Sequence, residues 1–168
     1  MTRAISIHSS VLIEAPEEAV WRVCAEEFGH IDRWDANVRH SRSDEDADTK
    51  TFGRTCAMYS GGETGERIIS LERDSRTFSY QIVKGLPGFV ACATNRWTIE
   101  QPSLRGAVEL EMRLDMELTG LIGFFMQVPV RAQMSKLLRQ AQEELKHFLE
   151  TGEPHPRKQR KLEKVKSS

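Results

Sequence analysis

Cysteine is scarce in this chain of 168 residues, which contains only Cys24, Cys56 and Cys92. The three lie far apart among apolar residues, whereas a disulfide framework or a zinc site requires cysteines in even number or in close clusters. We therefore interpret them as buried free thiols, which behave as small apolar side chains. This interpretation favours a reducing compartment and predicts a cytoplasmic protein.

Long hydrophobic runs are also missing. The longest candidate, Leu118–Val130, is interrupted by glycine and polar residues, and a membrane-spanning helix needs roughly 18 or more apolar residues. Residues 1–10 contain one basic residue and no apolar core, so no signal peptide is expected. With 39% hydrophobic and 29% charged residues, the composition is that of a soluble globular protein, most simply of one domain.

Familiar catalytic motifs are absent as well. The sequence has no nucleophile elbow, Walker loop, dinucleotide-binding fingerprint or serine–histidine–aspartate order. His30, Asp32 and Asp35 share one short polar turn, but no second cluster of ligands accompanies them, so we interpret them as residues that cap and solvate the turn. We predict neither a metal site nor a cofactor, and no residue is identified as a nucleophile.

Basic charge is concentrated near the C-terminus. The segment Arg157–Lys166 contains six basic residues and one acid, whereas the whole chain has a net charge of -1. The rest of the chain is therefore acidic, which argues against nucleic-acid binding.

We predict a basic, flexible tail over residues 153–168, after a single domain that spans residues 1–152. Pro154 and Pro156 interrupt any continuing helix. The tail contains only two aliphatic residues, too few to offset roughly 1–2 kcal/mol of conformational entropy per ordered residue. Deleting it is therefore expected to leave folding and ligand affinity almost unchanged.

The longest helical pattern extends from Leu121 to Glu150. Apolar residues recur there at spacings of three and four, opposite a polar face, and Gly152 follows as a stop signal. Pro129 is either a first-turn proline or, if the helix already begins at Leu121, the site of a kink. The apolar positions are Val130, Met134, Leu137, Leu138, Ala141, Leu145 and Phe148. A helix with such a face needs a partner surface of matching length.

Alternation with a period of two dominates the rest of the chain. A first strand is expected over residues 2–13, followed by a helix that Pro16 opens and Gly29 ends, and by a short helical turn that presents Trp34. Six strands joined by short connections then follow, at 38–43, 52–60, 64–72, 77–83, 91–99 and 108–118. This order predicts an α+β architecture in which an antiparallel meander of about seven strands packs on the long helix.

Several local signatures occur in an order that resembles a known superfamily. They are Ile13–Pro16 before Val20 and Trp21, Phe28 and Gly29, Trp34, Gly53 and Arg54, Gly61 and Gly62, Glu66 and Arg67, Tyr80, and Gly85–Pro87. With them, residues 6–150 resemble the SRPBCC superfamily, the START-type helix-grip proteins, and most closely its polyketide cyclase/dehydrase-like branch. One segment departs from the glycine-rich loop of the pollen-allergen members: residues 44–50 are acidic and contain no glycine, so no anion-binding loop is expected there.

The resemblance implies a curved sheet that grips the C-terminal helix around an apolar cavity. It favours binding or transport of a hydrophobic small molecule, such as a lipid, an isoprenoid or a polyketide. One alternative is a cyclase or dehydratase that uses Glu66 or Tyr80 as acid or base in the same cavity, since burial raises a carboxyl pKa toward neutrality. Another alternative is a protein-interaction module. The sequence does not decide whether the protein is an enzyme, nor its oligomeric state.

The side chains expected to contact a ligand belong to two groups. Flexible thioethers and an aromatic ring supply an adaptable apolar surface, although the same pattern also fits ordinary core packing; these are Met112, Met116, Phe125 and Met134. A few polar or amphipathic side chains supply orientation, namely Trp34, Arg54, Tyr59, Tyr80, Asn95 and Trp97. Asn95 lies in the apolar register of its strand, where a buried amide needs a partner in the protein or in a ligand.

Arg54 and Glu66 lie on strands that flank the Gly61–Gly62 turn. A turn centred on these glycines places Arg54 opposite Ile69, with Glu66 diagonal to it. The pair is either a solvated surface ion pair or, if it faces the cavity, a buried pair that orients a ligand or takes part in acid–base chemistry.

Overall fold

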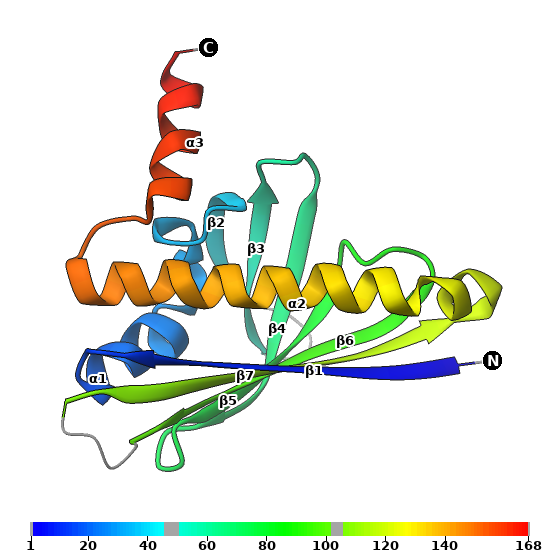
Figure 1. Cartoon of the computed structure of the whole chain (residues 1–168), viewed down its shortest axis with the longest axis horizontal. Coiled ribbons are helices and arrows are strands. Elements are labelled where there is room, and N and C mark those ends of the chain that lie inside the picture. Colours follow the sequence, from blue (N-terminus) through cyan, green and yellow to red (C-terminus); the bar gives the residue numbers. More distant parts are fainter. Residues whose placement is uncertain (1, 46–50, 102–105, 168) are drawn as a thin grey trace.

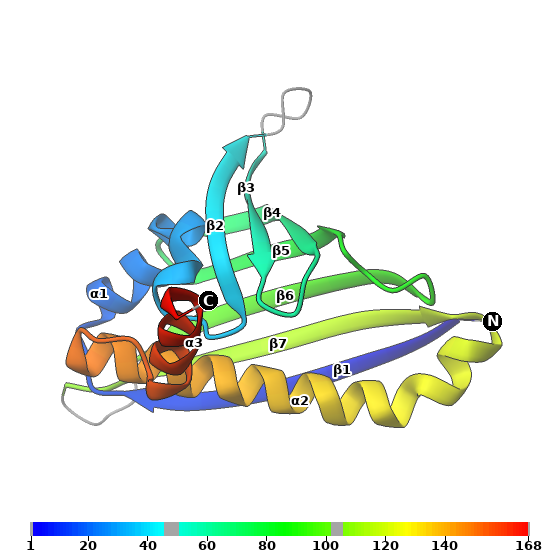
Figure 2. The same cartoon turned by 90° about the horizontal axis from the view of Figure 1, so that it is seen from above.

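The computed structural model describes residues 2–45, 51–101 and 106–167. Its centre is an antiparallel sheet of seven strands in the order β1-β7-β6-β5-β4-β3-β2, curved around one long helix (Figures 1 and 2). The strands are β1 (Thr2–Ile13), β2 (Val38–Glu45), β3 (Phe52–Met58), β4 (Glu63–Glu72), β5 (Thr77–Lys84), β6 (Val90–Glu100) and β7 (Val108–Thr119). This architecture confirms the predicted α+β helix-grip fold.

Short helical segments between β1 and β2 close one end of the sheet. They are α1 (Glu17–Trp21), the π-helical η1 (Arg22–Glu26) and the 3-10 helix η2 (Phe28–Arg33). Pro16 precedes α1 as its N-cap, and two glutamates occupy the first turn, where the positive end of the helix dipole favours acids. The side chains of Trp21 and Phe28 in this segment are fully buried, so the segment forms part of the hydrophobic core.

The long helix α2 (Gly120–Thr151) lies along the concave face of the sheet (Figure 1). It begins at Gly120, so Pro129 lies inside the helix rather than in its first turn. Gly152 adopts a left-handed conformation with φ of 78° and ends the helix, as glycine without a Cβ does readily. Leu138 and Leu145 are buried beneath it, as its apolar stripe predicts.

Side chains of α2 also bond to the main chain of the edge strand β1. Arg131 donates to the carbonyl of Ser6, Gln142 to that of Ser9 and Lys146 to that of Leu12. These three hydrogen bonds attach α2 to β1 along most of the length of the strand.

The last helix, α3 (Pro156–Lys166), occupies most of the segment that we predicted to be a flexible tail. Lys158 is buried and donates to the carbonyl of Val38, and Arg157 bonds to Glu143 and to the buried Glu144. The docking is polar, so counting aliphatic residues gave no indication of it. The domain boundary at residue 152 and the mobility of the tail in solution stay predictions.

Residues 46–50, most of the acidic connection in the sequence, lie outside the described residues. In the part of the chain that the structure describes, no helix is long and apolar enough to cross a membrane.

Candidate functional site

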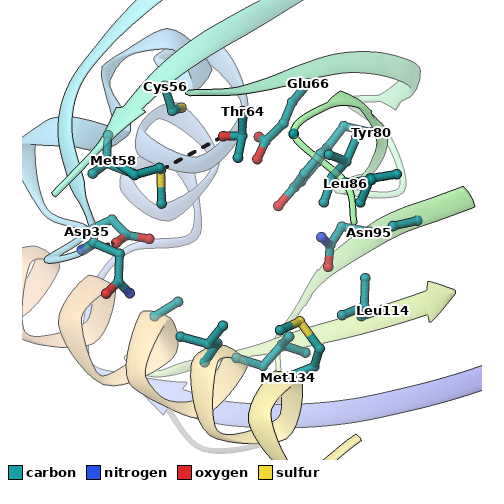
Figure 3. Close-up of a pocket in the computed structure, with 18 of the residues that line it drawn as sticks. Asp35, Cys56, Met58, Thr64, Glu66, Tyr80, Leu86, Asn95, Leu114 and Met134 are labelled. Carbon is teal, nitrogen blue, oxygen red and sulfur yellow. Dashed lines mark hydrogen bonds between the residues drawn. The ribbon is translucent and has the colours of Figure 1, made fainter. Parts of the chain in front are cut away.

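A cavity of about 550 Å³ lies between the concave face of the sheet and α2 (Figure 3). Most of its lining is apolar, as in sites for hydrophobic small molecules. The sheet contributes Ile82, Ala93, Met112, Leu114 and Met116, the β5–β6 connection contributes Leu86, Pro87 and Phe89, and α2 contributes Val130, Met134, Leu137, Leu138 and Ala141. Met112, Met116 and Met134 line the cavity, and their contact with a ligand stays a prediction.

An aromatic cluster forms one end of the cavity. The Phe78 ring lies 5.3 Å from Trp97 and 6.3 Å from Phe28, and Phe28 lies 5.1 Å from Tyr80. Trp34, presented after η2 as the sequence predicted, tilts against Trp97 at 6.5 Å. These contacts are in the range that favours aromatic pairs, so the cluster fixes the orientation of the Tyr80 and Trp97 side chains, which both line the cavity.

The Arg54–Glu66 pair lies at the cavity wall. The two residues are direct partners across β3 and β4, so the prediction that Arg54 opposes Ile69 was wrong. The glycines at 61 and 62 both have positive φ but stand to one side of the hairpin loop, whose flanking pair is Ala57 and Glu63. The loop is thus longer than a two-residue turn, and this shifts the register.

The guanidinium of Arg54 is only 3% exposed and has several partners. Its Nε donates to Glu66 Oε2 at 2.6 Å, its Nη2 lies 2.5 Å from the same oxygen, and its Nη1 donates to the carbonyl of Phe28 at 2.9 Å. Its Cζ lies 3.8 Å above the Phe28 ring. Burial disfavours the charge, but Glu66, Tyr80 and Cys56 together more than offset this, so the pKa of Arg54 is raised and the group stays protonated.

Tyr80 and Asn95 are direct partners across β5 and β6 and face the cavity together (Figure 3). No described residue accepts or donates a hydrogen bond to the Tyr80 hydroxyl or the Asn95 amide within the described part of the chain. The indole Nε1 of Trp97 is buried and likewise has no partner there. Burial raises the pKa of Tyr80, so its phenol stays protonated. This part of the wall offers hydrogen-bonding groups that the protein does not use.

Asp35 is a cavity residue that we had interpreted as a capping residue. It follows η2 and lies on the wall opposite Tyr80 and Asn95 (Figure 3). Its Oδ1 accepts a hydrogen bond of 2.7 Å from the Asn37 amide. Burial raises its pKa, although the Asn37 amide and the charges of Arg54 and Lys158 partly oppose the effect. Tertiary packing places this half-buried carboxyl at the cavity wall, and the local sequence carried no signal of that position.

The other acid of that turn, Asp32, has a different partner. The Ser41 hydroxyl donates to Asp32 Oδ1 at 2.9 Å. Among the described residues, no group of three or more histidine, cysteine, aspartate or glutamate side chains is placed to hold a metal ion.

Two predicted ligand contacts, Tyr59 and Phe125, do not line the cavity. Tyr59 lies on the β3–β4 hairpin, where Lys158 and Lys161 of α3 approach its ring at 5.2 and 5.3 Å. Phe125 is 74% exposed on the outer side of α2. Tyr59 follows directly after β3, where the alternation of the strand has ended. Phe125 lies five residues before Val130, and at about 100° per residue this places it away from the apolar stripe of α2.

Several further lining residues were not among our candidates, including Asn37, Cys56, Met58, Thr64 and Gln133. Cys56 follows Arg54 by two residues on β3, so the period of two was a usable signal for it. Burial raises the pKa of Cys56 to about 12, and the group is therefore a neutral thiol rather than a reactive thiolate.

A model of the family described as "Polyketide cyclase / dehydrase and lipid transport" matches residues 4–150. The chain belongs to this family. The match covers β1 through almost all of α2, so all the cavity-lining residues lie within it, and α3 lies outside it. No curated protein matches the sequence significantly.

Solved structures similar to this member of the polyketide cyclase/dehydrase and lipid transport family share its fold. An uncharacterised protein from Bacillus thuringiensis has a TM-score of 0.71 at 14% identity, over 86% of this chain and 98% of its own. The protein XoxI from Bacillus cereus has a TM-score of 0.70 at 15% identity, over 89% and 99%. A norcoclaurine synthase mutant from Thalictrum, solved with a transition-state analogue, has a TM-score of 0.66 at 12% identity, over 89% and 96%. At these identities the likeness establishes the fold alone.

Proposed function

We propose that this protein binds a hydrophobic small molecule, lipid-, isoprenoid- or polyketide-like, in the cavity between its sheet and α2, and sequesters or carries it. The observation that carries this proposal is the cavity itself: about 550 Å³, mostly apolar, with a few polar groups on its walls. Ordinary protein cores are close-packed and contain few voids larger than a water molecule. A void of this size in the centre of a small domain therefore has a cost that a bound ligand offsets.

The distribution of polarity in the cavity supports the same function. Met112, Met116 and Met134 supply flexible thioethers that adapt to ligand shape. The Tyr80 and Asn95 side chains supply hydrogen bonds that fix one end of the ligand. The free cysteines Cys24 and Cys56 are buried, which is compatible with action in the reducing cytoplasm.

Native mass spectrometry of protein purified without denaturant tests this proposal. We expect a mass excess that corresponds to a retained lipophile and disappears after organic extraction. A matched control is Ala93→Phe, which places a large side chain at a fully buried cavity position; it should lower the retained mass in a protein that stays folded by circular dichroism. Wild-type protein without retained mass that also fails to bind added lipophiles would contradict the proposal.

A second function, acid–base catalysis of the cyclase or dehydratase type, is favoured by one observation. Asp35 and Tyr80 both face the cavity, and burial keeps both protonated over a wider pH range than in water. A carboxylic acid with a raised pKa on one wall and a phenol on the other are suited to donate protons to a carbonyl substrate. Turnover of a polyketide-like ketone that is lost in Asp35→Asn, while binding is kept, would establish this function.

A further inference from the structure

The charges that line the cavity determine which ligands it can hold. The lining contains one cation, Arg54, and two acids, Asp35 and Glu66, among the described residues. An anionic ligand buried in an apolar cavity needs a cationic or strong donor group free to pair with it, because an unpaired buried charge is costly. The question is whether Arg54 is free to do so.

Arg54 is already engaged on each side that the structure describes. Nε and Nη2 contact Glu66, and Nη1 donates to the Phe28 carbonyl. The flat face of the guanidinium stacks on the Phe28 ring at 3.8 Å. A ligand carboxylate would have to displace Glu66, which lies in the same wall and would then itself be an unpaired buried charge.

No lysine or histidine lines the cavity in the described ranges. Lys158 is near, since its charge acts on Asp35, but its Nζ is bound to the Val38 carbonyl and α3 contributes nothing to the lining. Glu66 already neutralises Arg54, and Asp35 offers an anion no countercharge. The cavity is thus electrostatically unfavourable for a carboxylate or a phosphate.

Uncommitted hydrogen-bonding groups gather instead on the Tyr80 wall. The Tyr80 hydroxyl and the Asn95 amide are on directly paired residues of β5 and β6, line the cavity and have no hydrogen-bond partner among the described residues. Polar groups in an apolar cavity need a partner, and a carbonyl or hydroxyl oxygen of a ligand would satisfy them without bringing charge. The Nε1 of the adjacent Trp97 also lacks an acceptor, but it is covered and has no surface open to the cavity.

We infer that the cavity selects uncharged lipophiles that carry a carbonyl or hydroxyl oxygen, and that it rejects carboxylates of the same chain length. The inference rests on the proposed binding function and names its ligand class. The oxygen lies against the wall formed by Tyr80 and Asn95, and the hydrocarbon part lies against the methionines and α2.

Displacement of a neutral fluorescent lipophile, N-phenyl-naphthylamine, from the full-length protein tests the ligand class. The competitors are dodecanol, methyl undecyl ketone, dodecanoate and dodecylamine, each below its critical micelle concentration and at about pH 8, where the free acid is ionised. We expect the alcohol and the ketone to displace the probe at concentrations about tenfold or more lower than dodecanoate.

A variant pair separates the cause from the fold. Glu66→Gln leaves Arg54 without its countercharge, so dodecanoate affinity should rise about tenfold or more while dodecanol affinity changes little. The double variant Arg54→Met with Glu66→Met has no free cation, so it should keep the wild-type preference for the alcohol. If Glu66→Gln does not fold, the wild-type series and the double variant decide the question.

Each outcome has a distinct meaning. Dodecanoate or dodecylamine binding to the wild-type protein as tightly as dodecanol would overturn the ligand class and leave the binding function standing. Failure of the probe and of all four competitors to bind would overturn the proposed function itself. A gain of dodecanoate affinity in Glu66→Gln but not in the double variant would support the ligand class, because it would show that Glu66 keeps Arg54 from pairing with the carboxylate.

Discussion

Two polar clusters share the concave face of one sheet, and they differ in how completely their hydrogen bonds are used. On β3 and β4, Arg54 and Glu66 satisfy each other, and the Phe28 carbonyl takes a further donor. On β5 and β6, Tyr80, Asn95 and the Trp97 indole have no described partner. The first cluster is closed and the second is open.

The difference separates stability from binding. A closed buried pair costs little as long as both members are present, but removal of one member leaves an uncompensated charge. An open donor carries its desolvation cost already in the unliganded protein, and a ligand removes that cost. We therefore expect substitutions in the closed cluster to act on the free energy of unfolding, and those in the open cluster to act on ligand affinity.

The largest expected effect comes from breaking the closed cluster at Arg54. Arg54→Met leaves Glu66 without its countercharge in the cavity wall, and should lower the free energy of unfolding by about 3–5 kcal/mol. Urea denaturation measures this loss. The double variant with Glu66→Met should recover most of it, and a double variant no more stable than the single one would contradict the assignment.

The second expected effect concerns Glu144, a buried acid of α2 whose charged partner comes from α3. Glu144 is 1% exposed, and its partners are Arg157 of α3 and the Ala36 amide. Arg157→Ala should lower the free energy of unfolding by about 1–3 kcal/mol, because the carboxylate keeps only one of these two partners. Arg160→Ala, at an exposed position of the same helix, is the matched control and should change it by less than about 0.5 kcal/mol.

These contacts revise the expectation that deletion of the tail leaves folding unchanged. Truncation after Gly152 should lower the melting temperature at least as much as Arg157→Ala, because it also removes the Lys158 contact with the Val38 carbonyl. Thermal unfolding followed by circular dichroism compares the two proteins. An unchanged melting temperature would show that the docked helix contributes nothing to stability.

The third expected effect is a change in how the free energy of unfolding depends on pH. Burial raises the pKa of Asp35 in the folded protein, and the charges of Arg54 and Lys158 oppose this only in part. Glu144 of α2 is a further acid near Asp35. The folded state therefore binds the proton more tightly than the unfolded state, and stability falls as the pH rises from the ordinary aspartate value through the raised value. Asp35→Asn removes this penalty, so its stability relative to wild type should increase over that window. Urea titrations at a series of pH values measure the difference, and a constant difference would contradict it.

The smallest expected effect on stability lies in the open cluster. Asn95→Leu should change the free energy of unfolding by less than about 1 kcal/mol, since the amide has no described partner to lose. It should weaken dodecanol binding by about threefold to tenfold, because one hydrogen bond to the ligand is lost. A loss of stability with unchanged affinity would assign Asn95 to the structure instead of to the ligand.

The sequence predicted most of the fold because its strongest patterns are long. Alternation over β7 and the apolar stripe of α2 each repeat over many residues, so single exceptions do not obscure them. The site was less predictable. Trp34, Tyr80, Asn95 and the three methionines were placed in the cavity by pattern and resemblance, whereas the burial of Asp35 depends on packing between segments far apart in the sequence.

The register error has a similar origin. The position of a hairpin loop depends on backbone geometry that two adjacent glycines do not determine. The loop is not centred on Gly61 and Gly62, so the partner of Arg54 is Glu66 instead of the predicted Ile69. A wrongly centred turn therefore gives wrong cross-strand partners even where both strands are predicted well.

The contacts of α2 with β1 have a consequence for self-association. As the outermost strand of an open sheet, β1 offers main-chain groups to which a strand from another molecule can add, and such edges promote aggregation. Arg131 and Lys146 donate to the carbonyls of Ser6 and Leu12, which point to the same side of that strand because they are an even number of positions apart. The helix that covers the cavity therefore also occupies two main-chain acceptors of β1 that an added strand would otherwise use.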